Sequence, residues 1–116
     1  MRLIRLRTTR FRSFEQIDVP ISTITAVVGQ NNAGKSGLLR ALNAFFHPEL
    51  ERPFFEDGSH RYTKRSKARI ELVFDNLPRR NLITAASHNN TLTIRASWGD
   101  RTDEVEYEIC KGNRYS

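Results

Sequence analysis

Residues 29–36 read GQNNAGKS and directly follow the apolar run TITAVV, and this junction constrains the fold more than any other segment. Gly29, Gly34, Lys35 and Ser36 match the phosphate-binding loop pattern, in which a glycine and four further residues precede Gly-Lys-Ser/Thr. Such a loop requires a strand before it and a helix after it, because loop N–H groups and the positive end of the helix surround the phosphates together. The spacing therefore predicts a nucleotide-binding α/β domain.

Each position of the loop has a physical reason. Gly29 lets the chain turn sharply off the strand, and Gly34 lets the backbone approach the phosphates without a Cβ in the way. Lys35 would reach the β- and γ-phosphates of ATP and is the candidate catalytic residue, while the Ser36 hydroxyl would ligate Mg²⁺. The candidate nucleotide-contacting residues of this segment are Gly29, Gln30, Asn31, Asn32, Ala33, Gly34, Lys35, Ser36 and Gly37.

The flanking residues fit that requirement. Residues 22–28 are rich in β-branched side chains and predict a strand covered on both faces, in the centre of a mixed sheet. From Lys35 the apolar spacing becomes helical until Pro48. One stripe of this helix carries Leu38, Leu42 and Phe45, with Leu39 and Phe46 beside it.

Alternating polar and apolar residues predict further strands over 2–11, 15–21, 68–76, 91–98 and 103–110. A hairpin around residues 12–15 would join the first two strands, and a turn at Gly99 and Asp100 the last two. Residues 78–88 favour a short helix. Residues 48–68 contain two prolines, a glycine and many charges, and we expect an irregular insertion there.

Composition narrows the class of protein. With 116 residues, of which 38% are hydrophobic, the chain has the size of one globular domain. Its single cysteine, Cys110, cannot form an internal disulfide, and no Cys or His pair has metal-ligand spacing. The N-terminus lacks the apolar core of a signal peptide, and no segment is long enough to span a membrane. These features predict a soluble, cytoplasmic protein.

The net charge of +6 arises largely from two clusters of basic residues. Either cluster could contact phosphate on a nucleotide or on DNA. Alternatively, Arg5 and Arg7 form the solvated face of an edge strand and residues 61–69 form a solvated loop. The first cluster is Arg2, Arg5, Arg7, Arg10 and Arg12, and the second is Arg61, Lys64, Arg65, Lys67 and Arg69.

The segment TTRFRSFEQIDVPIS, continuing through the loop to LLRALNAFF, resembles the N-terminal part of ATPase heads of the SMC, RecF and OLD (overcoming lysogenization defect) group, a branch of the ABC-type ATPases. The resemblance is close over residues 1–48 and looser to Lys111, and it is somewhat stronger to OLD proteins. It implies ATP and Mg²⁺ as cofactors, contacts from Arg12 and Ser13 to phosphate or adenine, and pairing of two heads around the nucleotide.

The resemblance also implies what a longer protein would contain. The Q-loop glutamine, signature motif, paired acidic residues and switch histidine of such heads have no counterpart here, so 1–116 reads as the N-terminal lobe of an ATPase domain whose remainder is absent. Asp75 could act as the magnesium aspartate, but without a following glutamate it reads as an ordinary strand-end residue.

Three functions follow from these observations. The first is an OLD-like, ATP-regulated endonuclease of antiphage defence that acts on DNA, has a metal-dependent Toprim nuclease region and works with a partner defence protein. The second is an SMC- or RecF-like DNA clamp or repair ATPase without nuclease activity. The third is a small module that binds nucleotide for assembly only.

Overall fold

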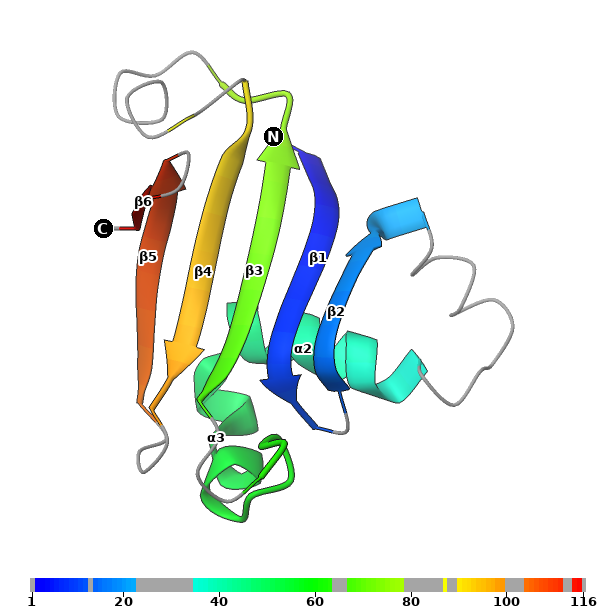
Figure 1. Cartoon of the computed structure of the whole chain (residues 1–116), viewed down its shortest axis with the longest axis vertical. Helices are drawn as coiled ribbons and strands as arrows, with labels where there is room; N and C mark the ends of the chain where they lie inside the picture. Colours follow the sequence, from blue (N-terminus) through cyan, green and yellow to red (C-terminus); the bar gives the residue numbers. More distant parts are fainter. Residues whose placement is uncertain are drawn as a thin grey trace.

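A computed structural model describes residues 2–12, 14–22, 35–63, 67–78, 87, 90–99, 104–111 and 114–115. Its described strands form one sheet in the order β2-β1-β3-β4-β5-β6, with every neighbouring pair antiparallel (Figure 1). The strands are β1 (Arg2–Phe11), β2 (Phe14–Pro20), β3 (Ala68–Asp75), β4 (Leu92–Trp98), β5 (Val105–Lys111) and β6 (Arg114–Tyr115).

The strand predictions over 2–11, 15–21, 68–76, 91–98 and 103–110 are confirmed to within a few residues. Phe11 pairs with Phe14 across the expected first hairpin, and Trp98 pairs with Val105 across the last one. The strand expected over 22–28 lies outside the described residues except for Ser22, whose backbone is helical. The described sheet is therefore antiparallel, and the mixed sheet that we expected is not found in this part of the chain.

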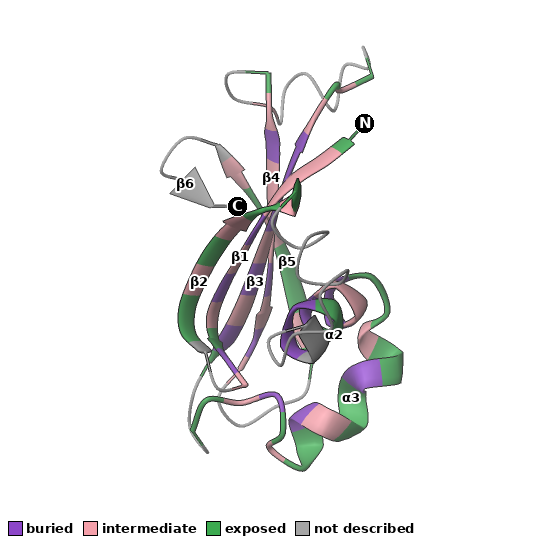
Figure 2. Ribbon diagram, turned by 90° about the vertical axis from the view of Figure 1, so that its right-hand side faces the viewer, coloured by how far each residue is buried: buried purple, intermediate pink, exposed green. Residues whose placement is uncertain are grey.

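Two helices cover one face of the sheet, as the edge-on view in Figure 2 shows. They are α2 (Lys35–Phe46) and α3 (Pro48–Glu56). Leu38, Ala41 and Phe45 of α2 are buried, because the 3.6-residue period brings them to one stripe facing the strands. Leu39 and Phe46, expected beside that stripe, are 40% and 52% exposed.

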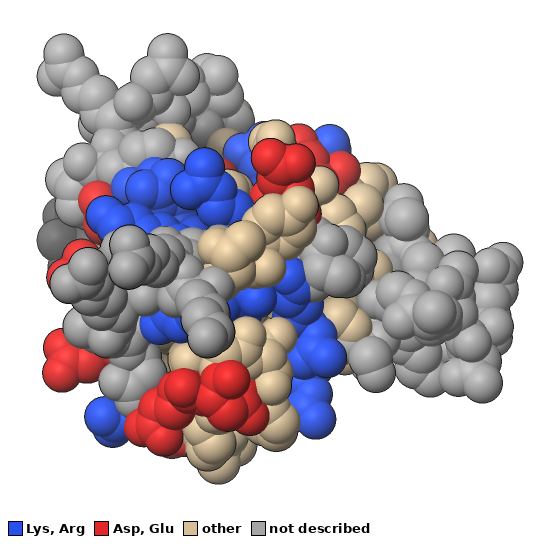
Figure 3. All heavy atoms as spheres, turned by 60° about the horizontal axis from the view of Figure 1, so that its bottom comes forward, with Lys and Arg blue, Asp and Glu red and all other residues tan. Residues whose placement is uncertain are grey.

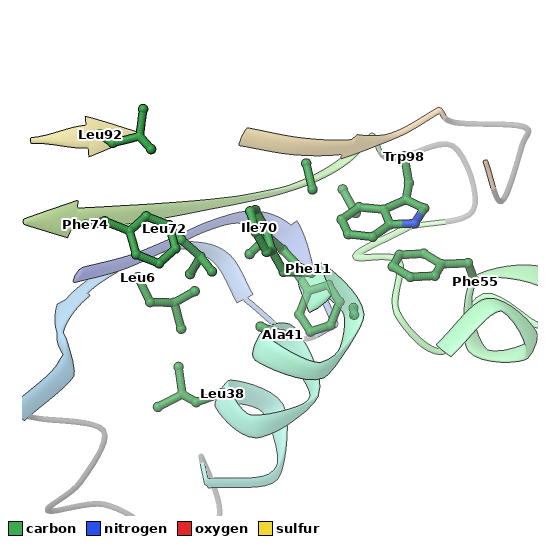
Figure 4. Close-up of a cluster of buried hydrophobic side chains, with 14 residues drawn as sticks. Leu6, Phe11, Leu38, Ala41, Phe55, Ile70, Leu72, Phe74, Leu92 and Trp98 are labelled. Carbon is green, nitrogen blue, oxygen red and sulfur yellow. The ribbon is translucent and has the colours of Figure 1, made fainter. Parts of the chain in front are cut away.

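The core lies between α2, α3 and the strands β1, β3 and β4 (Figure 4). On β3 the period-2 pattern directs Ile70, Leu72 and Phe74 into it, as predicted. At one end of the core Phe55 of α3 stacks on Trp98 of β4, with ring centroids 4.4 Å apart and 12° between the planes. This contact ties α3 to the sheet.

The opposite face of the sheet carries a row of alternating charges across five strands. In register, Asp18, Arg7, Glu71, Arg95 and Glu108 lie side by side on β2, β1, β3, β4 and β5. The Arg95–Glu108 pair is 2.9 Å long, and Arg7 lies 3.3 Å from Asp18 and 3.5 Å from Glu71. Opposite charges placed across from each other stabilise a sheet modestly and neutralise this face.

This row corrects one expectation about the first basic cluster. Arg5 and Arg7 do lie on a polar sheet face, but β1 is an interior strand between β2 and β3, not an edge strand. Both edges of β1 are paired, because β2 folds back on one edge through the hairpin and β3 pairs with the other. Arg5 also forms an ion pair with Asp18.

The prediction of an irregular insertion over 48–68 is wrong for its first half, because residues 48–56 form the helix α3. Pro48 is compatible with the first turn of α3, where its missing N–H has no partner to lose. Pro53 lies inside α3 and cannot donate a helical hydrogen bond. The helix nevertheless continues to Glu56, and Glu51 and Phe55 on either side of Pro53 are buried. The short helix expected over 78–88 falls mostly outside the described residues.

Candidate functional site

Lys35 and Ser36 are the first two residues of α2, where the phosphate-loop pattern requires a helix to begin. Gly37 follows them and is buried. The rest of the predicted loop, residues 29–34, lies outside the described residues, as does Ser13. The structure thus places the helical end of the candidate site, while the cradle itself and the ligation of Mg²⁺ stay predictions.

Arg12, the other residue assigned to the nucleotide by resemblance, is fixed by its backbone. It lies in the β1–β2 hairpin turn with a φ of 54°, and Arg10 before it has a φ of 51°. Positive φ is uncommon for arginine, so the surrounding structure must hold the turn. The Arg12 N–H donates to the His60 carbonyl at 3.1 Å and the Tyr62 N–H to the Arg10 carbonyl at 3.3 Å.

The conformation at Arg10 also changes which side chains enter the core. Leu6 and Thr8 are buried, so strict alternation would direct Arg10 inward as well. Arg10 is instead exposed and Phe11 has no exposed surface. Phe11 then forms an antiparallel bridge with Arg61, and residues 60–62 pack along the end of the hairpin.

A cluster of polar side chains around the buried residues Glu51 and His60 connects this hairpin to both helices. Glu51 of α3 is 1% exposed and accepts two hydrogen bonds from the Arg40 guanidinium of α2, at 3.2 and 3.0 Å. His60 has no exposed surface, and its Nε2 lies 3.7 Å from Glu51 Oε2. Its Nδ1 lies 3.3 Å from Nη1 of Arg12. We call Arg12, Arg40, Glu51 and His60 the buried polar cluster after its two buried members, Glu51 and His60. Arg12 is partly exposed, and the Arg40 side chain is 44% exposed.

The pKa values of the two titratable members follow from this packing. For Glu51, burial works to raise the pKa, but hydrogen bonds from Asn43 and Arg40 and the Arg40 charge outweigh it, so the pKa lies below its ordinary value. For His60, burial is the largest influence and the arginines act with it against the attraction of Glu51, which lowers the pKa to about 4. At neutral pH the cluster therefore contains an ionised Glu51 and a neutral His60.

Sequence patterns did not identify this cluster. Glu51 and Arg40 come together only because α3 is a helix packed beside α2, and α3 was read as irregular. The one available signal was the spacing of Glu51 and Phe55, which a helix brings to the same face. A lone histidine in a charged stretch, such as His60, carries no spacing pattern that would mark it as buried.

Asp75 is confirmed at the end of β3, where the Arg2 guanidinium donates two hydrogen bonds to it at 2.9 and 2.7 Å. The hydrogen bond from Arg2 is the largest influence on Asp75 and lowers its pKa. Its carboxylate is thus engaged by a cation, which supports the interpretation of an ordinary strand-end residue. In the described part of the chain, no group of three or more His, Cys, Asp or Glu residues could hold a metal ion.

The second basic cluster is partly drawn into the fold. Arg61 donates to the carbonyls of Phe55 and Gly99, at 3.3 and 2.5 Å, and Arg69 lies within β3. Lys67 is exposed, and residues 64–66 lie outside the described residues. Figure 3, which views the end of the molecule where α3 lies, shows acidic side chains beside the basic ones. Contacts of either cluster with DNA stay predictions.

No described helix is long and apolar enough to cross a lipid bilayer.

Comparison with known proteins adds two findings. Residues 1–115 match the family model described as an AAA ATPase domain. Over 41 residues the chain is 49% identical to a protein named OLD nuclease from Thermus scotoductus, and the match covers 35% of this chain and 8% of that protein. The chain therefore corresponds to a small part of that relative's length.

Proposed function

Because the chain belongs to the family of AAA ATPase domains, we propose that residues 29–37 bind ATP with Mg²⁺ and that the complete gene product hydrolyses the bound ATP. In this proposal Lys35 contacts the β- and γ-phosphates and Ser36 ligates Mg²⁺. Arg12 and Ser13 contribute phosphate or adenine contacts from the hairpin turn.

One observation carries the proposal. The pattern of two glycines, lysine and serine ends where α2 begins, so Lys35 and Ser36 occupy the helix terminus that such a site uses. A helix N-terminus favours anions because its first N–H groups lack partners and its dipole is positive there. The family match over residues 1–115 supports the same assignment.

We further propose that ATP turnover regulates DNA cleavage in the complete gene product, in antiphage defence and through paired ATPase heads. The similarity to a protein named OLD nuclease favours this function over a DNA clamp without nuclease activity. The two functions differ in one measurable property. Mg²⁺-dependent cleavage of plasmid DNA by the purified gene product supports the nuclease, whereas ATP-dependent DNA binding without cleavage supports the clamp.

The nucleotide site itself is tested with Lys35→Ala in the complete gene product. Removing the ammonium group should lower ATP turnover about 100-fold, because the charge that develops on the phosphates loses a positioned cation. Arg52→Ala is the control, since this exposed cation of α3 lies outside the proposed site and outside both basic clusters. Measurements of released phosphate that are the same for Lys35→Ala, Arg52→Ala and the unaltered protein would contradict the assignment.

A further inference from the structure

The buried polar cluster presents Arg12 from a turn that is held from one side by residues 60–62. The Arg12 N–H and the His60 carbonyl form a hydrogen bond of 3.1 Å, and Phe11 bridges to Arg61 in the antiparallel sense. His60 therefore contacts Arg12 twice, through its carbonyl and through its ring nitrogen. A shift of residues 58–62 would therefore move the backbone and the side chain of Arg12 together.

The chemistry of the ring contact defines the tautomer of His60. A guanidinium has only donors, so Nδ1 of His60 must accept from Arg12 and cannot carry a proton. In a neutral imidazole the proton then resides on Nε2, which faces Glu51 Oε2 at 3.7 Å. At that separation the attraction between Nε2–H and the carboxylate is electrostatic and not a hydrogen bond.

The imidazole has little freedom to leave this orientation. Its ring centroid lies 4.8 Å from that of Phe11, 5.2 Å from that of Phe54 and 4.9 Å from that of Phe55. On the far side Glu51 is fixed by two hydrogen bonds from Arg40, whose guanidinium also lies 4.5 Å above the Phe54 ring. Arg40 lies in the second turn of α2, the helix that begins with Lys35.

We infer that His60 is a positioning residue that orients the Arg12 guanidinium towards the phosphates of bound nucleotide. In this arrangement the Glu51 charge favours the His60 tautomer that accepts from Arg12, and Arg40 anchors Glu51 to α2. The inference rests on the proposed function, because it assumes that Arg12 contacts nucleotide. It goes beyond that function by assigning roles to three residues outside the loop. One of the five N–H groups of the Arg12 guanidinium donates to His60, so this contact does not use the whole guanidinium group.

Substitutions at His60 separate its two ring nitrogens. In His60→Asn the side-chain oxygen occupies about the position of Nδ1, so an acceptor for Arg12 is kept. In His60→Gln the amide extends to the position of Nε2, so the contact with Glu51 is kept and the acceptor for Arg12 is lost. Binding of Mg·ATP to the complete gene product, measured by calorimetry, should weaken about tenfold in His60→Gln and about twofold or less in His60→Asn.

A double-substitution cycle tests whether His60 acts through Arg12. Arg12→Ala should weaken ATP binding about tenfold, and adding His60→Gln to it should weaken binding no further. If the two effects multiply, or if His60→Gln binds ATP as the unaltered protein does, the inference is overturned. Near-ultraviolet circular dichroism verifies that each variant keeps the folded packing of the unaltered protein.

Should His60→Gln lack the native circular dichroism, Glu51→Gln takes its place in the cycle with the same expected non-multiplicative effect. It keeps the side-chain shape and removes the charge that favours the His60 tautomer with its proton on Nε2. Lys35→Ala separates failure of the inference from failure of the proposed function. ATP affinity that Lys35→Ala abolishes and the His60 substitutions leave unchanged overturns the inference alone, whereas affinity indifferent to Lys35→Ala overturns the nucleotide site as well.

Discussion

The environment of His60 couples protonation to folding. The imidazole has no exposed surface, and the guanidinium groups of Arg12 and Arg40 lie on either side of the His60–Glu51 pair. Burial lowers the His60 pKa most, Glu51 opposes this, and the arginines add to it, giving a pKa of about 4 against an ordinary value of 6.5. Between these two values the unfolded chain binds a proton at this residue and the folded chain does not.

We therefore expect the free energy of unfolding to decrease as the pH falls from 6.5 towards 4, by about 2 kcal/mol between pH 7.5 and pH 5. Stability is retained above pH 6.5, where both states hold a neutral His60. The pKa of Glu51 lies below 4.5, so its contribution is lost only at lower pH. Urea unfolding at the two pH values measures the difference, and in His60→Phe it should shrink to a few tenths of a kcal/mol. The same pH dependence in both proteins would show that another group is responsible.

At the scale of elements, Phe55 attaches α3 to the sheet through aromatic contacts with Trp98 of β4 and Phe11 of β1. Phe55→Ala removes the ring that stacks on Trp98 and leaves a cavity, which should destabilise the fold by about 3 to 5 kcal/mol. Leu50→Ala on the same helix is the matched control, because Leu50 is 63% exposed. Trp98 is the single tryptophan of residues 1–116, so its emission follows the unfolding of this chain in urea directly. Equal midpoints for the two variants would mean that α3 contributes nothing to the core.

The elements also show what the sequence could and could not predict. Strands such as β3 were predicted because alternation of Ile70, Leu72 and Phe74 is a local property that one covered sheet face imposes. The helix α3 was not predicted, because it contains Pro53 and many charged residues and its sequence shows no continuous apolar stripe. Its buried face, which includes Glu51, is formed only by tertiary packing. The interior position of β1 was likewise hidden, since strand order depends on contacts between segments far apart in the sequence.

The same limit applies to the candidate site. Lys35 and Ser36 could be assigned because the phosphate loop has fixed spacing and its mechanism demands a helix at that point. Glu51 and His60 could not, because their partners come from α2 and from the β1–β2 hairpin. Spacing motifs locate chemistry that lies within one turn, whereas a cluster assembled from four segments leaves no periodic trace.

For the whole molecule, the two faces of the sheet have different roles. One face carries the core and the helices, and the other carries the charge row from Asp18 to Glu108, in which each arginine has acidic neighbours. The net charge of +6 is therefore not concentrated on that face. Several acidic residues of the described chain are similarly engaged, with Glu51 bound by Arg40 and Asp75 by Arg2. Hydrolysis of ATP, however, requires a group that orients the attacking water and cations that neutralise the γ-phosphate.

We accordingly expect residues 1–116, expressed by themselves, to release no phosphate from Mg·ATP above background. Arg12 is the one described residue that we assign to the phosphates besides those of α2, and a single arginine cannot both neutralise charge and orient water. In the complete gene product a second head would close the site, so phosphate release per molecule should rise with protein concentration or reflect a stable dimer seen by light scattering. Steady turnover by 1–116 that does not depend on its concentration and is abolished by Lys35→Ala would refute the paired-head mechanism.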